Sequence, residues 1–122
     1  AHATQLAQRW RSYMAAWPTP PTSVAHGILD DETYDGRSLI EAMLDSNGWP
    51  MVASEAHLTA AAAGLMDGAG AVIPVTPTGA AGLAGLHEHL GATAASGGAH
   101  LVGLRHVVLL TGLDRDATPA AA

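Results

Sequence analysis

An unbroken apolar run at residues 107–110, Val-Val-Leu-Leu, is the feature that most constrains what this chain can fold into. A run of this kind, closed by Thr111 and Gly112, is typical of a β-strand that is covered on both faces. Such strands occur mainly in parallel sheets whose faces carry helices. The run therefore predicts an α/β fold built on a parallel sheet.

The rest of the chain alternates helical patterns with short apolar runs. Apolar residues at three- and four-residue spacing predict helices over residues 1–17, 38–45 and 54–67, and a further helix from Thr78 whose following loop covers residues 91–98. Ser54 has the chemistry of an N-cap, and Asn47 with Gly48 should end the second helix. Residues 49–53 and 71–75 are expected to be short strands, although Pro74 cannot donate to a ladder.

Three short strands make a thin sheet for a chain of 122 residues, which is long enough for one domain only. The doubly covered strand is either at the edge of a small three-layer domain or in a sheet that other polypeptide completes, and we favour the second arrangement. Residues 1–113 are then one part of a larger domain. Residues 114–122 have no periodicity and are expected to form a frayed tail.

The composition excludes several kinds of chemistry. The formal net charge is -6 and the five basic residues do not cluster, which argues against a nucleic-acid partner. There is no cysteine, and all five basic residues are arginine, so the chain has no thiolate and no lysine amine. No apolar run reaches the roughly 18 residues that span a bilayer, so we expect no membrane partner and a soluble, cytoplasmic protein.

Three groups of polar residues are candidate sites, and each is better explained without a function. Four histidines come nearest to a metal cluster: His87, His89, His100 and His106. His87 and His89 lie two apart on a predicted helix and so on different faces, whereas a shared metal prefers a spacing of three or four. The acidic trio at residues 30–32 fits a solvated turn before a helix. The serines beside histidine or glycine, Ser23 with His26 and Ser96, lack the pattern of a nucleophile elbow.

Two segments remain as candidate binding sites. Residues 77–82, Pro-Thr-Gly-Ala-Ala-Gly, place free backbone N–H groups and a hydroxyl at a helix start, where a ligand can approach. The alternative is a plain N-cap at Thr78 followed by small residues for helix packing. The second segment offers the Thr111 hydroxyl at the carboxyl end of the predicted strand, where open α/β sheets bind ligands.

In order along the chain, five motifs resemble the C-terminal third of the fold-type II pyridoxal-phosphate enzymes. Within that family the motifs are most similar to those of threonine synthase. The motifs also resemble those of threonine dehydratase and other members of the tryptophan-synthase-β-like group. The resemblance covers residues 1–113, with five motifs in the family's order and at similar gaps: Thr22-Ser23-Val24-Ala25-His26-Gly27-Ile28, the helix at residues 38–45, Val52-Ala53-Ser54-Glu55, Pro77-Thr78-Gly79-Ala80-Ala81-Gly82-Leu83-Ala84, and Val108-Leu109-Leu110-Thr111-Gly112.

The resemblance implies roles for seven residues around pyridoxal 5'-phosphate. Thr111 would hydrogen-bond the pyridine nitrogen, with Gly112 letting the ring come close. A neutral hydroxyl partner leaves that nitrogen unprotonated, which suits β-elimination and β-replacement. The remaining five line the pocket or pass near the ring: Thr78, Gly79, Ala80, Ala25 and Gly27.

Departures from the family bear on the substrate. Relatives often carry Glu where this chain has Thr76, and a small or acidic residue where it has His26. The family's Schiff-base lysine and glycine-rich phosphate loop lie upstream of the matching region, and neither occurs in this sequence.

Two functions follow from these observations. In the first, the chain is the C-terminal part of a pyridoxal-phosphate-dependent amino-acid lyase or synthase. It would be inactive alone, would need the N-terminal portion that carries lysine and phosphate loop, and would act on an amino-acid substrate within a homo-oligomer of the full enzyme. In the second, it is a free-standing small α/β domain for binding or assembly without catalysis.

Overall fold

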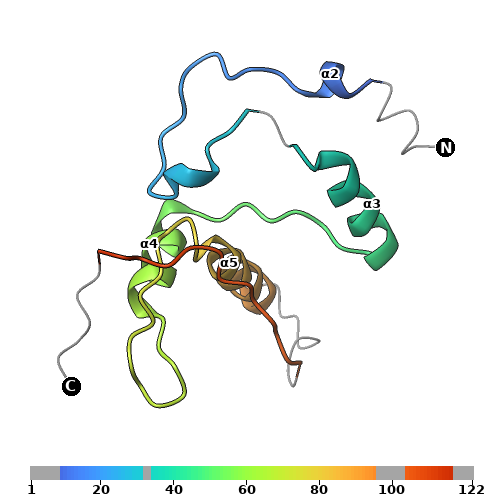
Figure 1. The fold of residues 1–122 in the computed structure, drawn as a ribbon. Helices are drawn as coiled ribbons and strands as arrows, with labels where there is room; N and C mark the ends of the chain where they lie inside the picture. The colour runs from blue at the N-terminus through green and yellow to red at the C-terminus, as the bar shows by residue number, and fades with distance from the viewer. Residues whose placement is uncertain (1–8, 32–33, 96–103, 117–122) are drawn as a thin grey trace. The chain divides into compact units, whose positions relative to one another are not determined.

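The computed structural model describes residues 9–31, 34–95 and 104–116 of the chain (Figure 1). The chain divides into two compact units, and each is described by itself. The first unit combines Ala1–Thr22 with Leu29–Pro50, and the second combines Ser23–Ile28 with Met51–Ala122. The candidate site residues all belong to the second unit.

The first unit contains the helices α2 and α3. Helix α2 covers only Trp10–Tyr13, so the helix predicted to continue to residue 17 ends earlier, and residues 1–8 lie outside the described part. A helix of one turn has too few hydrogen bonds to offset the cost of nucleation, and packing has to stabilise it.

Helix α3 covers Gly36–Ser46 and confirms the second predicted helix. Asn47 ends it in the left-handed conformation at a φ of 56°, and the Gly48 N–H donates to the Met43 carbonyl at 2.7 Å. On the helix surface the Arg37 Nε donates to Glu41 across one turn at 3.0 Å. The end of this helix is therefore set by local chemistry, as the sequence predicted.

In the second unit, helix α4 covers Glu55–Gly64 and starts where predicted. The Ser54 hydroxyl accepts from the His57 N–H at 3.3 Å, which is the N-cap interaction. The helix ends before the predicted boundary because Leu65 turns to an extended conformation. Met66 then pairs with Val72 in an antiparallel bridge around a tight turn.

Helix α5 covers Ala81–Ala95 and packs against α4. It begins three residues after the predicted start at Thr78, and it runs through Gly91, where a loop was expected. The rest of that expected loop, residues 96–98, lies outside the described part. None of the helices in the described ranges has the length and apolar content needed to cross a bilayer.

The predicted α/β fold with a partial three-layer parallel sheet is wrong for the described residues, which are helical and contain no sheet. Pairing between extended segments there is limited to two isolated antiparallel bridges, Met66 with Val72 and Val75 with Leu113. Residues 49–53 and 107–110 form neither strand nor bridge. The physical reason is that a strand exists only in a ladder, and no described segment forms backbone hydrogen bonds with residues 107–110.

The core of the second unit is built almost entirely from small side chains. It consists of Ala25, Leu58, Ala61, Val75, Ala80 and Ala84. Ala25 precedes the short 3₁₀ helix η1 (His26–Ile28), so the core joins this segment to α4 and α5. Two larger apolar residues of the same unit lie outside it, with Val107 91% exposed and Leu109 78% exposed.

Candidate functional site

Three segments that are far apart in the sequence meet in the second unit: residues 25–27, 76–80 and 111–112. We call this meeting point the three-segment site. The Gly27 N–H donates to the Thr78 hydroxyl at 3.1 Å, and the Thr111 N–H donates to the Gly79 carbonyl at 3.2 Å. Ala25 and Ala80 lie in the same buried core. The structure thus brings together the seven residues to which the resemblance assigns a role around the cofactor.

The turn before α5 is held by Thr76. Its hydroxyl accepts from the Gly79 N–H at 3.0 Å, and its carbonyl accepts from the Ala80 N–H at 2.9 Å. The Ala81 N–H donates to the Thr78 carbonyl at 3.3 Å. Three of the five N–H groups in residues 77–82 are therefore occupied, those of Gly79, Ala80 and Ala81.

The identity of the capping residue also differs from the expectation. The sequence offered Thr78 as a plain N-cap, but the Thr78 hydroxyl accepts from Gly27 and thereby holds the 25–27 segment. Thr76, two residues earlier, makes the cap-like hydrogen bond of the turn that precedes α5, accepting from the Gly79 N–H. Its spacing of three residues from Gly79 is a signal that capping rules can find.

Two glycines of the three-segment site allow backbones to touch. A Cβ atom at Gly79 would lie 2.5 Å from the Gly112 nitrogen and 2.7 Å from its Cα. A Cβ atom at Gly112 would lie 2.8 Å from the Thr76 hydroxyl oxygen. Real Cβ atoms do not come this close, so neither position has room for a side chain.

Exposure separates the residues that can touch a ligand from those that support them. Ala25 and Ala80 are completely buried, and Gly79 is buried as well. Thr78 and Gly112 are half-buried. Thr111 is exposed, and its hydroxyl has no hydrogen-bond partner among the described residues. The site therefore presents one neutral hydroxyl that is able to donate and to accept.

A second polar cluster, which the sequence did not predict, links α4 to α5. Glu88 accepts from the Ser54 N–H at 3.2 Å, and its carboxylate lies 2.5 Å from the His57 Nδ1. The hydrogen bond from His57, with a further one from the Ser54 backbone, holds the pKa of Glu88 below its ordinary value. The three side chains tie the start of α4 to α5.

This cluster does not have the geometry of a catalytic triad. The Ser54 hydroxyl and the Glu88 carboxylate both approach the same ring nitrogen of His57, at 3.1 and 2.5 Å. In a triad the serine and the acid occupy opposite nitrogens of the imidazole. The cluster is therefore a structural link between helices.

A neighbouring carboxylate ties the 25–27 segment to α4. Glu55 accepts from the Val24 N–H at 2.9 Å. The pKa of Glu55 lies below its ordinary value because of a hydrogen bond with the Ser23 hydroxyl and, second, the one from Val24. The sequence pattern does not predict either contact, because Ser23 and Val24 are about thirty residues from Glu55.

The histidines do not gather into a metal site within the described ranges. No group of three or more histidine and acidic side chains there is placed to hold a metal ion. His57 and His87 are neighbours, with ring centroids 6.3 Å apart and planes inclined at 67°. His100, which belonged to the group weighed from sequence, lies outside the described residues.

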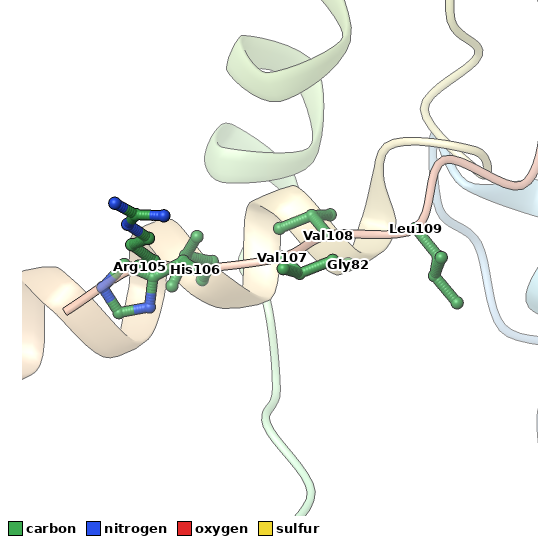
Figure 2. A pocket seen from close by; sticks show the side chains of 7 residues that line it. Gly82, Arg105, His106, Val107, Val108 and Leu109 are labelled. Carbon is green, nitrogen blue, oxygen red and sulfur yellow. The ribbon is translucent and has the colours of Figure 1, made fainter.

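A groove of about 490 Å³ runs between α5 and the extended segment that follows it (Figure 2). Val108 lies against the start of α5, where a Cβ atom on Gly82 would be 3.4 Å from its Cγ1. Arg105 and His106 line the same groove. A smaller pocket of about 100 Å³ is lined by Gly112, Pro74 and Leu110, among others.

Comparison of the chain with protein-family models, with curated proteins and with solved structures gave no match.

Proposed function

We propose that this chain forms the ring-facing part of a pyridoxal-phosphate-dependent enzyme of the threonine synthase-like group. The observation that carries the proposal is the three-segment site. Seven residues selected from three separated sequence motifs lie together, and the one hydroxyl presented there without a described partner belongs to Thr111. The reaction class is β-elimination or β-replacement on an amino-acid substrate.

The donor set fits the nitrogen end of the cofactor. A bound pyridoxal phosphate supplies an electron sink for carbanion chemistry at the substrate amino acid. The Thr111 hydroxyl would hold the pyridine nitrogen through a neutral hydrogen bond, which leaves that nitrogen unprotonated. Gly112, next to it, has no side chain to obstruct the ring edge. Ala25, Gly79 and Ala80 are buried and would hold the segments that carry the exposed Thr111 in place.

The aldehyde carbon and the phosphate group of the cofactor need residues from outside this chain. The sequence has no lysine, so the covalent attachment must come from other polypeptide. The N–H groups of Gly79, Ala80 and Ala81 are already hydrogen-bonded and do not form a phosphate cradle. We therefore propose that the N-terminal portion of the same enzyme supplies the lysine and the phosphate loop.

The extended segment at residues 104–110 supports the need for such a partner. Leu104, Val107 and Leu109 are each more than half exposed, and the backbone of residues 105–110 has no hydrogen-bond partner in the described part of the chain. Apolar segments with unpaired backbone groups associate with other chains unless they are covered. We propose that the partner polypeptide covers this segment, in a cytoplasmic homo-oligomer of the complete enzyme.

The test uses the natural polypeptide that carries these residues. The purified protein is examined for the visible absorbance of bound pyridoxal phosphate, reduced with borohydride, digested and analysed by mass spectrometry. We expect colour, with the reduced cofactor attached to a lysine outside the 122 residues. A colourless preparation without any adduct would refute the proposal and would favour the free-standing binding or assembly domain.

A further inference from the structure

Thr76 takes part in a closed set of hydrogen bonds that reaches from the turn before α5 to Thr111. Its hydroxyl accepts from the Gly79 N–H at 3.0 Å, and the Gly79 carbonyl accepts from the Thr111 N–H at 3.2 Å. Gly112 closes the set, because its carbonyl accepts from the Thr76 N–H at 3.2 Å. Thr76 contributes the only side chain to this set.

A capping role alone does not require this arrangement. An N-cap hydroxyl needs only the N–H group two or three residues later, which here is Gly79. Thr76 also bonds Gly112 through its backbone, and its hydroxyl oxygen lies so close to Gly112 that a Cβ atom there would be 2.8 Å away. The Thr76 hydroxyl therefore accepts from Gly79, which bonds Thr111, and lies next to Gly112, which follows Thr111.

The geometry points to Thr76 as a positioning residue that holds the exposed Thr111 hydroxyl at the ligand. Thr76 fixes Gly79, and Gly79 holds Thr111 through the only described hydrogen bond of the Thr111 backbone. Loss of the Thr76 hydroxyl would leave the Gly79 N–H without its acceptor and loosen the turn to which Thr111 is bonded. This inference rests on the proposed function for its ligand, while the coupling between Thr76 and Thr111 stands on the hydrogen bonds alone.

The coupling is tested by amide hydrogen exchange in the natural polypeptide that carries these residues. The decisive amide is that of Thr111, because its acceptor is Gly79 and not Thr76. We expect exchange at Thr111 to become about threefold to tenfold faster in Thr76→Val, which corresponds to one lost hydrogen bond. Thr76→Ser, which keeps the hydroxyl, should retain the wild-type rate.

Thr59→Val is the matched control, because Thr59 is an exposed threonine whose hydroxyl donates within α4 to the Glu55 carbonyl at 2.9 Å. It should leave the Thr111 amide unchanged. If Thr76→Val does not fold, Thr76→Ala removes the same hydroxyl and is measured in its place. An unchanged Thr111 amide, or equal acceleration in the serine variant, would overturn the inference.

A double-mutant cycle tests the consequence for the ligand, with pyridoxal 5'-phosphate as the probe. Thr76→Val should raise its Kd about threefold to tenfold in the wild-type background and have no further effect in a Thr111→Val background. Equal factors in both backgrounds would overturn the positioning role. If the wild-type protein binds no pyridoxal phosphate, the proposed function fails, and the Thr111 amide still decides whether Thr76 positions Thr111.

Discussion

Gly79 and Gly112 touch backbone to backbone. The atoms that would be met by a side chain on Gly79 are the carbonyl oxygen, the nitrogen and the Cα of Gly112, not the flexible end of a neighbouring side chain. The contact is fixed by the hydrogen bond from Thr111 to Gly79 on one side and by the bond from Thr76 to Gly112 on the other. Since backbone cannot rotate away as a side chain can, this crossing sets how the C-terminal segment lies on the turn before α5.

The first prediction concerns that crossing. Gly79→Ala should destabilise the second unit by about 1–3 kcal/mol, because overpacking against rigid backbone forces the two segments apart. The free energy of unfolding measured in urea checks the size of the effect.

Gly91→Ala is its control, since Gly91 lies within α5 and a Cβ atom there meets nothing within 4 Å. Removing a glycine from a helix interior should raise stability by up to about 1 kcal/mol. Equal effects of the two alanine substitutions would show that the Gly79–Gly112 contact is not tight in solution.

The second prediction concerns Thr111. Thr111→Val keeps the shape of the side chain and removes its hydroxyl, so affinity for pyridoxal phosphate should fall by about 0.5–1.5 kcal/mol. Because Thr111 is exposed and its hydroxyl has no described partner, the melting temperature should not change. An absorbance titration and a thermal scan of the natural polypeptide test the two parts, and unchanged cofactor affinity would remove Thr111 from the site.

Thr111→Asp should act differently from the valine variant. A carboxylate next to the pyridine nitrogen favours the protonated ring, which changes the absorbance spectrum of the bound cofactor and its dependence on pH. A spectrum equal to that of wild type across the pH range would place the ring nitrogen elsewhere.

The third prediction concerns acid stability. The pKa of Glu88 is lowered in the folded chain by its hydrogen bond with His57, so the unfolded chain takes up the proton first as the pH falls. The stability from this link is fully present above the ordinary glutamate pKa of about 4.3 and is lost as the pH falls through the lower folded-state pKa. The free energy of unfolding, measured in urea across this pH range, should fall less steeply with decreasing pH in Glu88→Gln than in wild type.

Glu41→Gln controls for the loss of one carboxylate, because Glu41 pairs with Arg37 on the surface of α3, which belongs to the first unit. Exposed ion pairs of this kind contribute little to stability. If the free energy of unfolding falls equally steeply at acid pH in Glu88→Gln and in wild type, the link between the helices is contradicted.

The fourth prediction concerns the extended segment. In the isolated 122 residues, Val107→Asp and Leu109→Asp should leave stability unchanged and reduce binding of an apolar dye, because both side chains are exposed. In the natural polypeptide the same changes should be strongly destabilising, since the partner would then bury a charge. Val72→Asp is the control, being 56% exposed and outside the segment. Tolerance of the Val107 and Leu109 changes in both settings would mean that nothing covers this surface.

The features that the sequence predicted well depend on neighbours a few residues away. Ser54 caps α4 and Asn47 ends α3 because their partners lie within one helical turn. The contacts that sequence reasoning did not predict join residues that are distant in the sequence. Glu88 of α5 hydrogen-bonds His57 of α4, and the Val24 N–H donates to Glu55. Such pairs have no pattern in a single sequence.

The predicted sheet failed for a related reason. The apolar run at residues 107–110 has the composition of a buried strand, but composition does not supply the adjacent strand that a ladder needs. Leu113, just after this run, pairs instead with Val75, antiparallel and through a single bridge. Helix α4 likewise ends early because Met66 pairs with Val72 across the turn. In both places an isolated antiparallel bridge is found where the apolar pattern predicted regular structure.

The alanine-rich core of the second unit has a consequence for how the chain unfolds. The heat-capacity change and the urea dependence of unfolding both scale with the area newly exposed to water. Ala25, Ala61, Ala80 and Ala84 each bury little area, so both quantities should be low for a chain of this length. The isolated chain should therefore melt over a wide temperature range. A sharp transition would appear only when other polypeptide adds buried surface, which makes cooperativity a property of the assembly.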